Sequence, residues 1–192
     1  NTTAVLMGKT PHAVREAAQA ARRAGVPWVL DPVAVGAGAG EDDQVVRGLL
    51  EFKPTAIRGN ASELIALAGG IGGGKGVETT LDSSEALPFI AEFSRSQGTI
   101  TAVSGPVDFI TDGVRTISVT GGEPRLTQVT GAGCSLGALT AALLSTPLAP
   151  VIAVAAAHVL YAEASQRAAS ARGTGSFAAR FLDELSLLGE VE

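Results

Sequence analysis

Cysteine, histidine and aromatic residues are scarce in this chain of 192 residues. The only cysteine is Cys134, so a disulfide within the chain is impossible, and one cysteine with two histidines offers no recognised zinc-binding spacing. A chain without disulfides suits a reducing compartment, and we expect a cytoplasmic protein. Because aromatics make up only 4% of the residues, the core must be built from Ala, Val, Leu and Ile.

Positive charge and long apolar runs are also missing. Asp and Glu outnumber Lys and Arg 19 to 14, so the sequence lacks the basic patch of proteins that bind nucleic acid or anionic membranes. The most apolar region, 136–162, is broken by Pro147 and Pro150, and neither half reaches the roughly 18 apolar residues of a membrane helix. The first residues carry no signal-peptide pattern. We expect neither a nucleic-acid partner nor a membrane partner.

Glycine is abundant, at 24 residues, and short β-branched runs alternate with amphipathic segments. This alternation is typical of βα units with a parallel sheet. Strands are predicted at 4–7, 26–30, 55–58 and 100–104, with two more near 107–110 and 114–119 that add antiparallel members. Helices are predicted at 11–25, 41–51, from Asn60 onward, 84–97, 134–144, 149–169 and 176–188. Without a linker or internal repeat, residues 1–192 are expected to form one domain.

Polar residues follow several of the predicted strands. Asp31 ends one strand, Arg58 and Asn60 end the next, and Ser104 ends a third. In open α/β sheets the carboxyl ends of parallel strands face the crevice where ligands bind. Asn60 and Glu63 also have the spacing of a capping box, which is a structural reading of the same residues. The convergence of several strand ends, rather than any one residue, predicts a site at this edge.

The turn Thr130-Gly131-Ala132-Gly133-Cys134 follows a predicted strand at 126–129 and opens an apolar helix. Its glycines allow consecutive backbone N–H groups to face outward at a helix N-terminus, which is a natural site for a phosphate. The helix dipole there would favour the thiolate of Cys134. Two plainer readings stay open: a tight turn that binds nothing, and a buried cysteine that acts as a small apolar residue.

Two other motif matches are rejected. Residues 69–75 fit the spacing of a Walker A loop, but Gly76 replaces the hydroxyl residue and the preceding segment is predicted to be helical, so we expect a flexible loop. Residues 133–137 fit the nucleophile elbow of hydrolases, with Ser135 as nucleophile. No Asp or Glu lies between Ser135 and His158, the only downstream histidine, so the triad order fails. His158 is expected to be a core residue.

Taken together, the motifs resemble those of the hydroxyethylthiazole kinase family in the ribokinase-like superfamily. They are Val29-Leu30-Asp31-Pro32-Val33, Ile57-Arg58-Gly59-Asn60-Ala61-Ser62-Glu63, Lys75-Gly76-Val77, Val103-Ser104-Gly105-Pro106-Val107-Asp108, Val129 to Cys134, and Gly173-Thr174-Gly175-Ser176-Phe177. The resemblance implies a three-layer αβα fold with a mostly parallel sheet. It also implies Mg2+-dependent phosphorylation by ATP of the hydroxyl of 4-methyl-5-(2-hydroxyethyl)thiazole, in thiamine salvage.

The resemblance also implies roles for single residues. By this resemblance, ATP is bound by Arg58, Ser104 and Asn60, and the thiazole is contacted by Gly131. The anion turn is completed by Thr130, Ala132 and Gly133, and Mg2+ is organised by Asp31 and Glu63. The position of the catalytic base is occupied by Cys134. Oxygen ligands with retained waters are what Mg2+ prefers. A thiol is an unusual base, so its role in deprotonating the substrate is a hypothesis.

Two departures from the family pattern accompany the resemblance. Relatives carry some tens of residues before the first predicted strand, including a substrate-contacting methionine that Met7 does not match, so the chain is expected to lack an N-terminal segment and part of its substrate site. The loop 36–43 lacks the Thr and Arg that many relatives have there. Family members form trimers with active sites between subunits, so a homotrimer is expected. The alternatives are a related hydroxymethylpyrimidine-type kinase and an inactive ligand-binding module.

Overall fold

The computed structural model describes residues 10–33, 35–36, 41–69, 74–75, 78–79 and 81–189. The predicted strand at 4–7 and most of the loop at 69–76 lie outside these residues. The elements in chain order are α1 (Thr10–Ala24), β1 (Val29–Leu30), α2 (Glu41–Gly48), η1 (Leu49–Phe52), β2 (Ala56–Asn60), α3 (Ala61–Leu67), β3 (Gly74–Lys75), β4 (Glu78–Thr79), η2 (Ser83–Ala86), α4 (Leu87–Gln97), β5 (Ile100–Ser104), β6 (Val107–Thr111), β7 (Thr116–Thr120), η3 (Pro124–Gln128), α5 (Ala132–Leu143), α6 (Pro150–Arg167), η4 (Ala168–Ser170) and α7 (Thr174–Leu187).

The main sheet has the strand order β1-β2-β5-β6-β7. The β1–β2 and β2–β5 pairs are parallel, whereas β5–β6 and β6–β7 are antiparallel, so the prediction that the sheet gains antiparallel members is confirmed. The register pairs Asn60 of β2 with Ser104 of β5. Two of the predicted site residues therefore stand side by side at one edge of the sheet.

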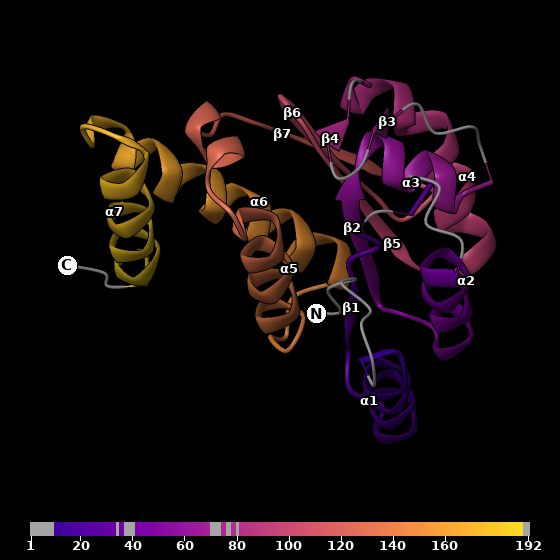
Figure 1. The fold of residues 1–192 in the computed structure, drawn as a ribbon. Coiled ribbons are helices and arrows are strands. Elements are labelled where there is room, and N and C mark those ends of the chain that lie inside the picture. The colour runs from indigo at the N-terminus through magenta and orange to yellow at the C-terminus, as the bar shows by residue number, and fades with distance from the viewer. Residues whose placement is uncertain are drawn as a thin grey trace.

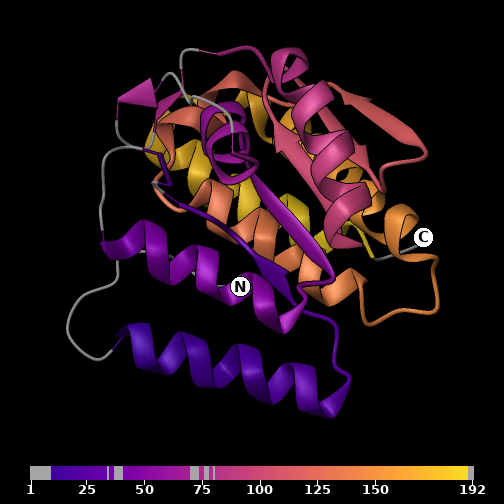
Figure 2. The ribbon, with the colours of Figure 1, turned by 90° about the vertical axis from the view of Figure 1, so that its right-hand side faces the viewer.

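Helices cover both faces of this sheet, as Figure 1 shows. Helices α2, α3 and α4 lie on one face, and α5 and α6 lie on the other, with α7 packed on the far side of α6. Turned by 90°, the molecule shows α1 running alongside α2 (Figure 2). Buried aliphatic residues fill each interlayer space, one cluster centred on Leu30, Ile57 and Leu64 and another on Val29, Ala102 and Val154. The predicted three-layer αβα fold is confirmed.

Local sequence signals set several element boundaries as predicted. Helix α3 begins at a capping box, because the Asn60 side chain accepts from the Glu63 N–H and the Glu63 carboxylate accepts from the Asn60 N–H. Strand β1 is shorter than predicted, since only Val29 and Leu30 pair with β2. Among the described residues, none of the helices is both long and apolar enough to cross a membrane.

One predicted local structure is wrong. The segment 126–129 is not a strand: Pro124–Gln128 forms the short 3-10 helix η3, in which the Val129 N–H donates to the Leu126 carbonyl and the Leu126 N–H to Glu123. Pro124 favours this start, because its fixed φ suits a first helical position. Within the loop at 69–76, Gly74–Lys75 pairs with Glu78–Thr79 as a small antiparallel ladder. Helix α3 precedes this loop, so the rejection of a Walker A site holds.

Candidate active site at the carboxyl ends of the strands

Arg58 joins the ends of three neighbouring strands. Its Nη1 donates to Asp31 Oδ2 at 3.3 Å, just after β1, and its Nη2 donates to Ser104 Oγ at 3.0 Å, at the end of β5. The Asp31 side chain is only 1% exposed and that of Arg58 12%, so this ion pair is largely removed from water. The predicted convergence of Asp31, Arg58 and Ser104 is confirmed, and it follows from the parallel register of β1, β2 and β5.

The turn before α5 reaches the same place. A Cβ built on Gly133 would lie 2.7 Å from Arg58 Nη1, so the turn backbone packs directly against the guanidinium and a side chain at that position has no room. Gly131 has φ +85° and ψ −1°, a left-handed conformation that glycine adopts without strain. At the start of α5 the Ala132 N–H donates to the Val129 carbonyl at 3.2 Å, and the Gly133 N–H that follows can face an anion. The turn arrives from η3 rather than from a strand.

Asn60 and Glu63 lie at the adjoining start of α3. Asn60 Oδ1 accepts from the Glu63 N–H at 3.0 Å and from Ser62 Oγ at 3.2 Å, and Glu63 Oε2 accepts from the Asn60 N–H at 2.9 Å. The pair therefore forms the predicted helix cap, and this cap lies at the edge of the predicted site. Glu63 is 6% exposed, so its carboxylate is held in a fixed position.

Asp31 is a buried carboxyl whose hydrogen-bond partners are incomplete. Burial raises the pKa of its carboxyl above the ordinary value, and the neighbouring Arg58 charge partly opposes that rise. Its Oδ1 atom is buried and has no hydrogen-bond partner in the part of the chain that the structure describes, and the same holds for Arg58 Nε. Unpartnered buried polar atoms are costly, which points to a group that completes their contacts.

The thiol of Cys134 differs from the prediction. Burial raises its pKa, the negative charges of Asp31 and Glu63 raise it further, and Arg58 acts in the opposite direction. The expected preference for the thiolate is therefore wrong for the free protein, because desolvation and the two nearby carboxylates favour the neutral thiol. The same influences show that the thiol, both acids and Arg58 share one small region.

Ser135 and His158 do not form a hydrolytic pair. The Ser135 hydroxyl lies 2.9 Å from the Ala132 carbonyl and 2.7 Å from the Tyr161 hydroxyl, whereas His158 Nδ1 lies 2.6 Å from Asp108 Oδ2 on β6. His158 is 1% exposed, which confirms it as a core residue. Sequence reasoning missed Tyr161, the single tyrosine, because an apolar helix gives no sign of what its buried hydroxyl contacts.

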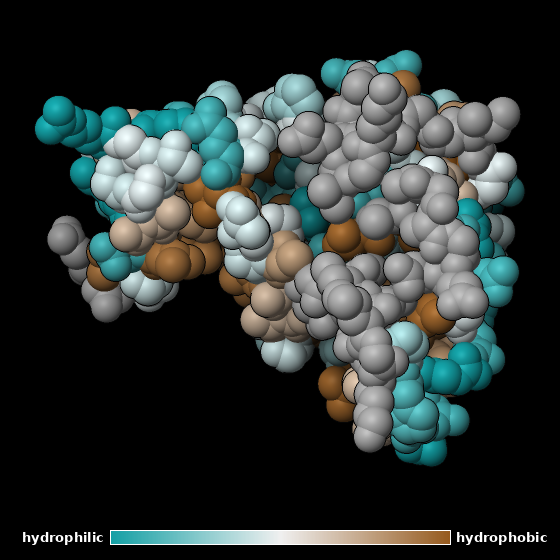
Figure 3. Space-filling model, viewed as in Figure 1, coloured by the Kyte–Doolittle hydropathy of each residue, from teal (hydrophilic) through white to brown (hydrophobic). Residues whose placement is uncertain are grey.

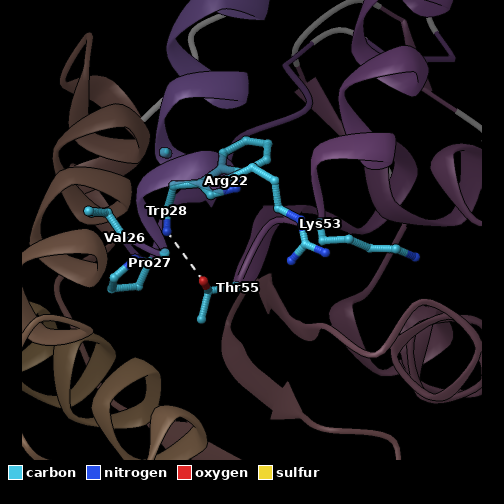
Figure 4. A pocket seen from close by; sticks show the side chains of 8 residues that line it. Arg22, Val26, Pro27, Trp28, Lys53 and Thr55 are labelled. Carbon is cyan, nitrogen blue, oxygen red and sulfur yellow. Dashed lines mark hydrogen bonds between the residues drawn. The ribbon is translucent and has the colours of Figure 1, made fainter.

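A shallow pocket lies at the opposite end of the strands. It is lined by Arg22, Trp28, Lys53 and Thr55, among others. The backbone N–H of Trp28 donates to Thr55 Oγ1 at 3.3 Å (Figure 4). Its volume of about 180 Å³ is below the roughly 300 Å³ at which pockets for small-molecule ligands begin. It sits at the amino ends of β1 and β2, away from the Arg58 cluster, so it is not the predicted site.

Comparison with known proteins agrees with the geometry. Residues 2–190 match the model of the hydroxyethylthiazole kinase family. A hydroxyethylthiazole kinase of Burkholderia pseudomallei (strain 668) is 60% identical over 190 residues, which are 99% of this chain and 69% of that protein. The structure of a hydroxyethylthiazole kinase from Pyrococcus horikoshii OT3 superposes with a TM-score of 0.83 at 33% identity, covering 97% of this chain and 70% of that one.

A more distant structure supports the fold alone. A ribokinase-like superfamily protein of Enterococcus faecalis V583 has a TM-score of 0.61 at 14% identity, covering 94% of this chain and 60% of that one. The fold is thus ribokinase-like. The family match extends over nearly the whole chain and includes Asp31, Arg58 and Ser104, which the structure brings together. The chain therefore belongs to the hydroxyethylthiazole kinase family.

Proposed function

We propose that this chain is a kinase that transfers the terminal phosphoryl group of ATP to the hydroxyl of 4-methyl-5-(2-hydroxyethyl)thiazole, a salvage step of thiamine biosynthesis. The observation that carries the proposal is the position of Arg58, which contacts Asp31 and Ser104 while lying against Gly133 at the start of α5. One cation, one buried carboxylate and a helix N-terminus thus meet where a triphosphate would be held.

Arg58 and Ser104 are the proposed ATP-binding side chains, with Asn60 beside them at the end of β2. A guanidinium offers several donors in a fixed plane, which suits phosphate oxygens. Within the proposed anion turn of Thr130, Ala132 and Gly133, the Ala132 N–H donates to the Val129 carbonyl. The Gly133 N–H would therefore face the phosphoryl group as its charge spreads over the equatorial oxygens. Preorganised donors of this kind stabilise the transition state without having to move.

Asp31 and Glu63 are the proposed residues for Mg2+. No group of three or more His, Cys, Asp or Glu side chains is arranged to hold a metal within the described ranges, but Mg2+ in kinases uses one or two carboxylates together with phosphates and waters. The unpartnered Asp31 Oδ1 fits such a ligand. When bound, Mg2+ would neutralise charge on the phosphates.

Gly131 and Cys134 are the proposed contacts for the thiazole alcohol. Gly131 is the N-cap of α5, and Cys134 lies within the first turn of the same helix, half-buried beside the two acids. A raised pKa leaves Cys134 as a neutral thiol in the free protein, so it would have to lose its own proton before it could accept that of the substrate hydroxyl. Turnover of Cys134→Ser tests this role: nearly full activity at saturating substrates would remove it.

The organisation of the protein is part of the proposal. Residues 1–192 are proposed to form one kinase domain of the cytoplasm, and three copies are proposed to assemble as a homotrimer. Large apolar side chains remain exposed on α6 and α7: Ile152 at 42%, Val159 at 51% and Leu182 at 59%. Apolar residues also gather where α7 meets α5 and α6 (Figure 3). Light scattering after size exclusion measures the assembly directly, and a mass of one chain contradicts the trimer.

The deciding experiment measures ADP release with Mg-ATP in the presence and absence of the thiazole alcohol. Release that depends on the thiazole supports the proposal. Equal release with hydroxymethylpyrimidine supports the related kinase instead, and ATP binding without substrate-dependent release supports an inactive binding module. Arg58→Gln is the matching variant, since it keeps a polar N–H donor while removing the charge and the guanidinium. Its apparent KM for ATP should rise about tenfold or more, from the loss of charged hydrogen bonds.

A further inference from the structure

Tyr161 reaches from α6 to the anion turn. Its hydroxyl donates to the Ala132 carbonyl at 2.5 Å and lies 2.7 Å from Ser135 Oγ. The backbone hydrogen bonds of the turn are local to it: the Ala132 N–H donates to the Val129 carbonyl at 3.2 Å, and the Ser135 N–H to the Gly131 carbonyl at 2.9 Å. Tyr161 therefore provides a long-range hydrogen bond, across 29 residues of sequence, to the backbone that begins α5.

The tyrosine ring is itself held rigidly. It is 5% exposed and meets the Phe181 ring edge-on, with centroids 4.7 Å apart and planes at 74°. Burial raises the pKa of the Tyr161 hydroxyl, so it keeps its proton at neutral pH and remains a donor to the Ala132 carbonyl. Ser135 also has a single hydroxyl proton, which it can give to the Tyr161 oxygen or to a carbonyl of the turn.

The same helix is fixed to the other half of the site. His158 and Tyr161 are three residues apart and share one face of α6. His158 Nδ1 lies 2.6 Å from Asp108 Oδ2, and Asp108 Oδ1 accepts from the Gly105 N–H at 2.9 Å, next to Ser104. Helix α6 thus contacts both the β5–β6 turn and the start of α5, so it can set the distance between them.

We propose that Tyr161 is a positioning residue of the kinase reaction, which holds the start of α5 at the separation from Arg58 and Ser104 that phosphoryl transfer requires. This inference rests on the proposed function of the site. The tyrosine need not touch a substrate: it fixes the Ala132 carbonyl, and through it the peptide groups whose N–H atoms face the phosphate. Reactions of this kind are sensitive to misplacement of about 1 Å.

Tyr161→Phe tests the inference, because it removes the hydroxyl while keeping the ring that packs on Phe181. We expect kcat to fall about tenfold, while the KM for ATP changes less than about twofold, since Arg58 and Ser104 still bind the nucleotide. The matched control is Thr140→Val. Thr140 lies on α5 and, like Tyr161, is buried. Its hydroxyl donates to the Leu136 carbonyl at 2.8 Å, and that carbonyl lies one helical turn further from the site than the Ala132 carbonyl. Its kcat should stay close to that of the unmodified protein.

Backbone hydrogen exchange gives a second readout that does not require turnover. The amides of Ala132 and Ser135 should exchange faster in Tyr161→Phe than in the unmodified protein, whereas Thr140→Val should leave them unchanged. A kcat within twofold of normal for Tyr161→Phe, an equal loss in Thr140→Val, or unchanged exchange at the turn would each overturn the inference. If the unmodified protein shows no thiazole-dependent ADP release, the proposed function fails, and the kinetic role of Tyr161 fails with it. The hydrogen-exchange comparison then decides only whether the tyrosine holds the turn.

Discussion

Adding one methyl group at Gly133 should disturb the centre of the site while leaving the fold intact. The new Cβ would lie 2.7 Å from Arg58 Nη1 and 3.4 Å from both Cζ and Nη2, so the guanidinium has to move. Its movement breaks or lengthens the bonds to Asp31 and Ser104. Since Arg58 is only 12% exposed, few other positions are open to it.

The magnitude follows from two opposing effects. Hydrogen bonds to charged groups contribute about 1.5–3 kcal/mol each, and Arg58 makes one to a neutral hydroxyl and one to a buried carboxylate. Alanine is better than glycine in a helix by about 1 kcal/mol at most. We therefore expect Gly133→Ala to lower the free energy of unfolding by about 2 kcal/mol, which corresponds to a fall in Tm of about 4–8 °C for a chain of this size.

Gly175→Ala is the matched control. Gly175 also follows the first residue of a helix whose N-cap is glycine, but a Cβ there meets no atom within 4 Å. Thermal unfolding followed by circular dichroism should show a lower Tm for Gly133→Ala and an unchanged or slightly higher Tm for Gly175→Ala. In an Arg58→Ala background the cost of Gly133→Ala should largely vanish, since the clash is gone. An equal cost in both backgrounds refutes the reasoning.

Three further outcomes are expected. In metal-free buffer, the stability that Asp31 contributes should be greatest below pH 4 and should fall as the pH rises through the raised pKa of the folded state. The reason is that the native state holds this proton more tightly than the unfolded chain does. Asp31→Asn should lose this part of the pH dependence of Tm. Cys134 should react with iodoacetamide more slowly than free cysteine at pH 8, since its pKa is raised. Asp31→Asn should speed the reaction of Cys134; equal rates in this variant and in the unmodified protein contradict the proximity of the two groups. Lys53 has φ +52°, so Lys53→Gly should raise the free energy of unfolding by about 0.5–1 kcal/mol in urea titrations; an unchanged or lower value contradicts backbone strain at this position.

Features set by nearby residues were predictable from the sequence. The capping box of Asn60 and Glu63 depends on residues three apart, and it formed as predicted. The meeting of Asp31, Arg58 and Ser104 required only a general property of parallel sheets, that their strands end at a common edge. The Thr130–Cys134 turn was placed correctly even though the element before it was assigned wrongly, because glycine at the start of a helix is a local signal.

Features that depend on distant residues were not predictable. The segment 126–129 was predicted to be a strand but lies in η3 and the residue after it, and Arg125 of η3 donates to the Ala171 carbonyl, 46 residues away. The contact of Tyr161 with Ala132 spans 29 residues, and that of His158 with Asp108 spans 50. The pKa of Cys134 depends on burial and on carboxylates from other elements, which a helix dipole inferred from sequence does not include.

Trp28, described above at the amino ends of the strands, is the only tryptophan of the chain. Its indole N–H donates to the Phe52 carbonyl at 3.3 Å, and the residue is 9% exposed, so its fluorescence emission should be blue-shifted in the folded protein and move to longer wavelength on unfolding. Because the indole lies at the end of the sheet away from Arg58, nucleotide binding should leave this emission nearly constant. One intrinsic fluorophore can thus follow denaturation without interference from ligand occupancy.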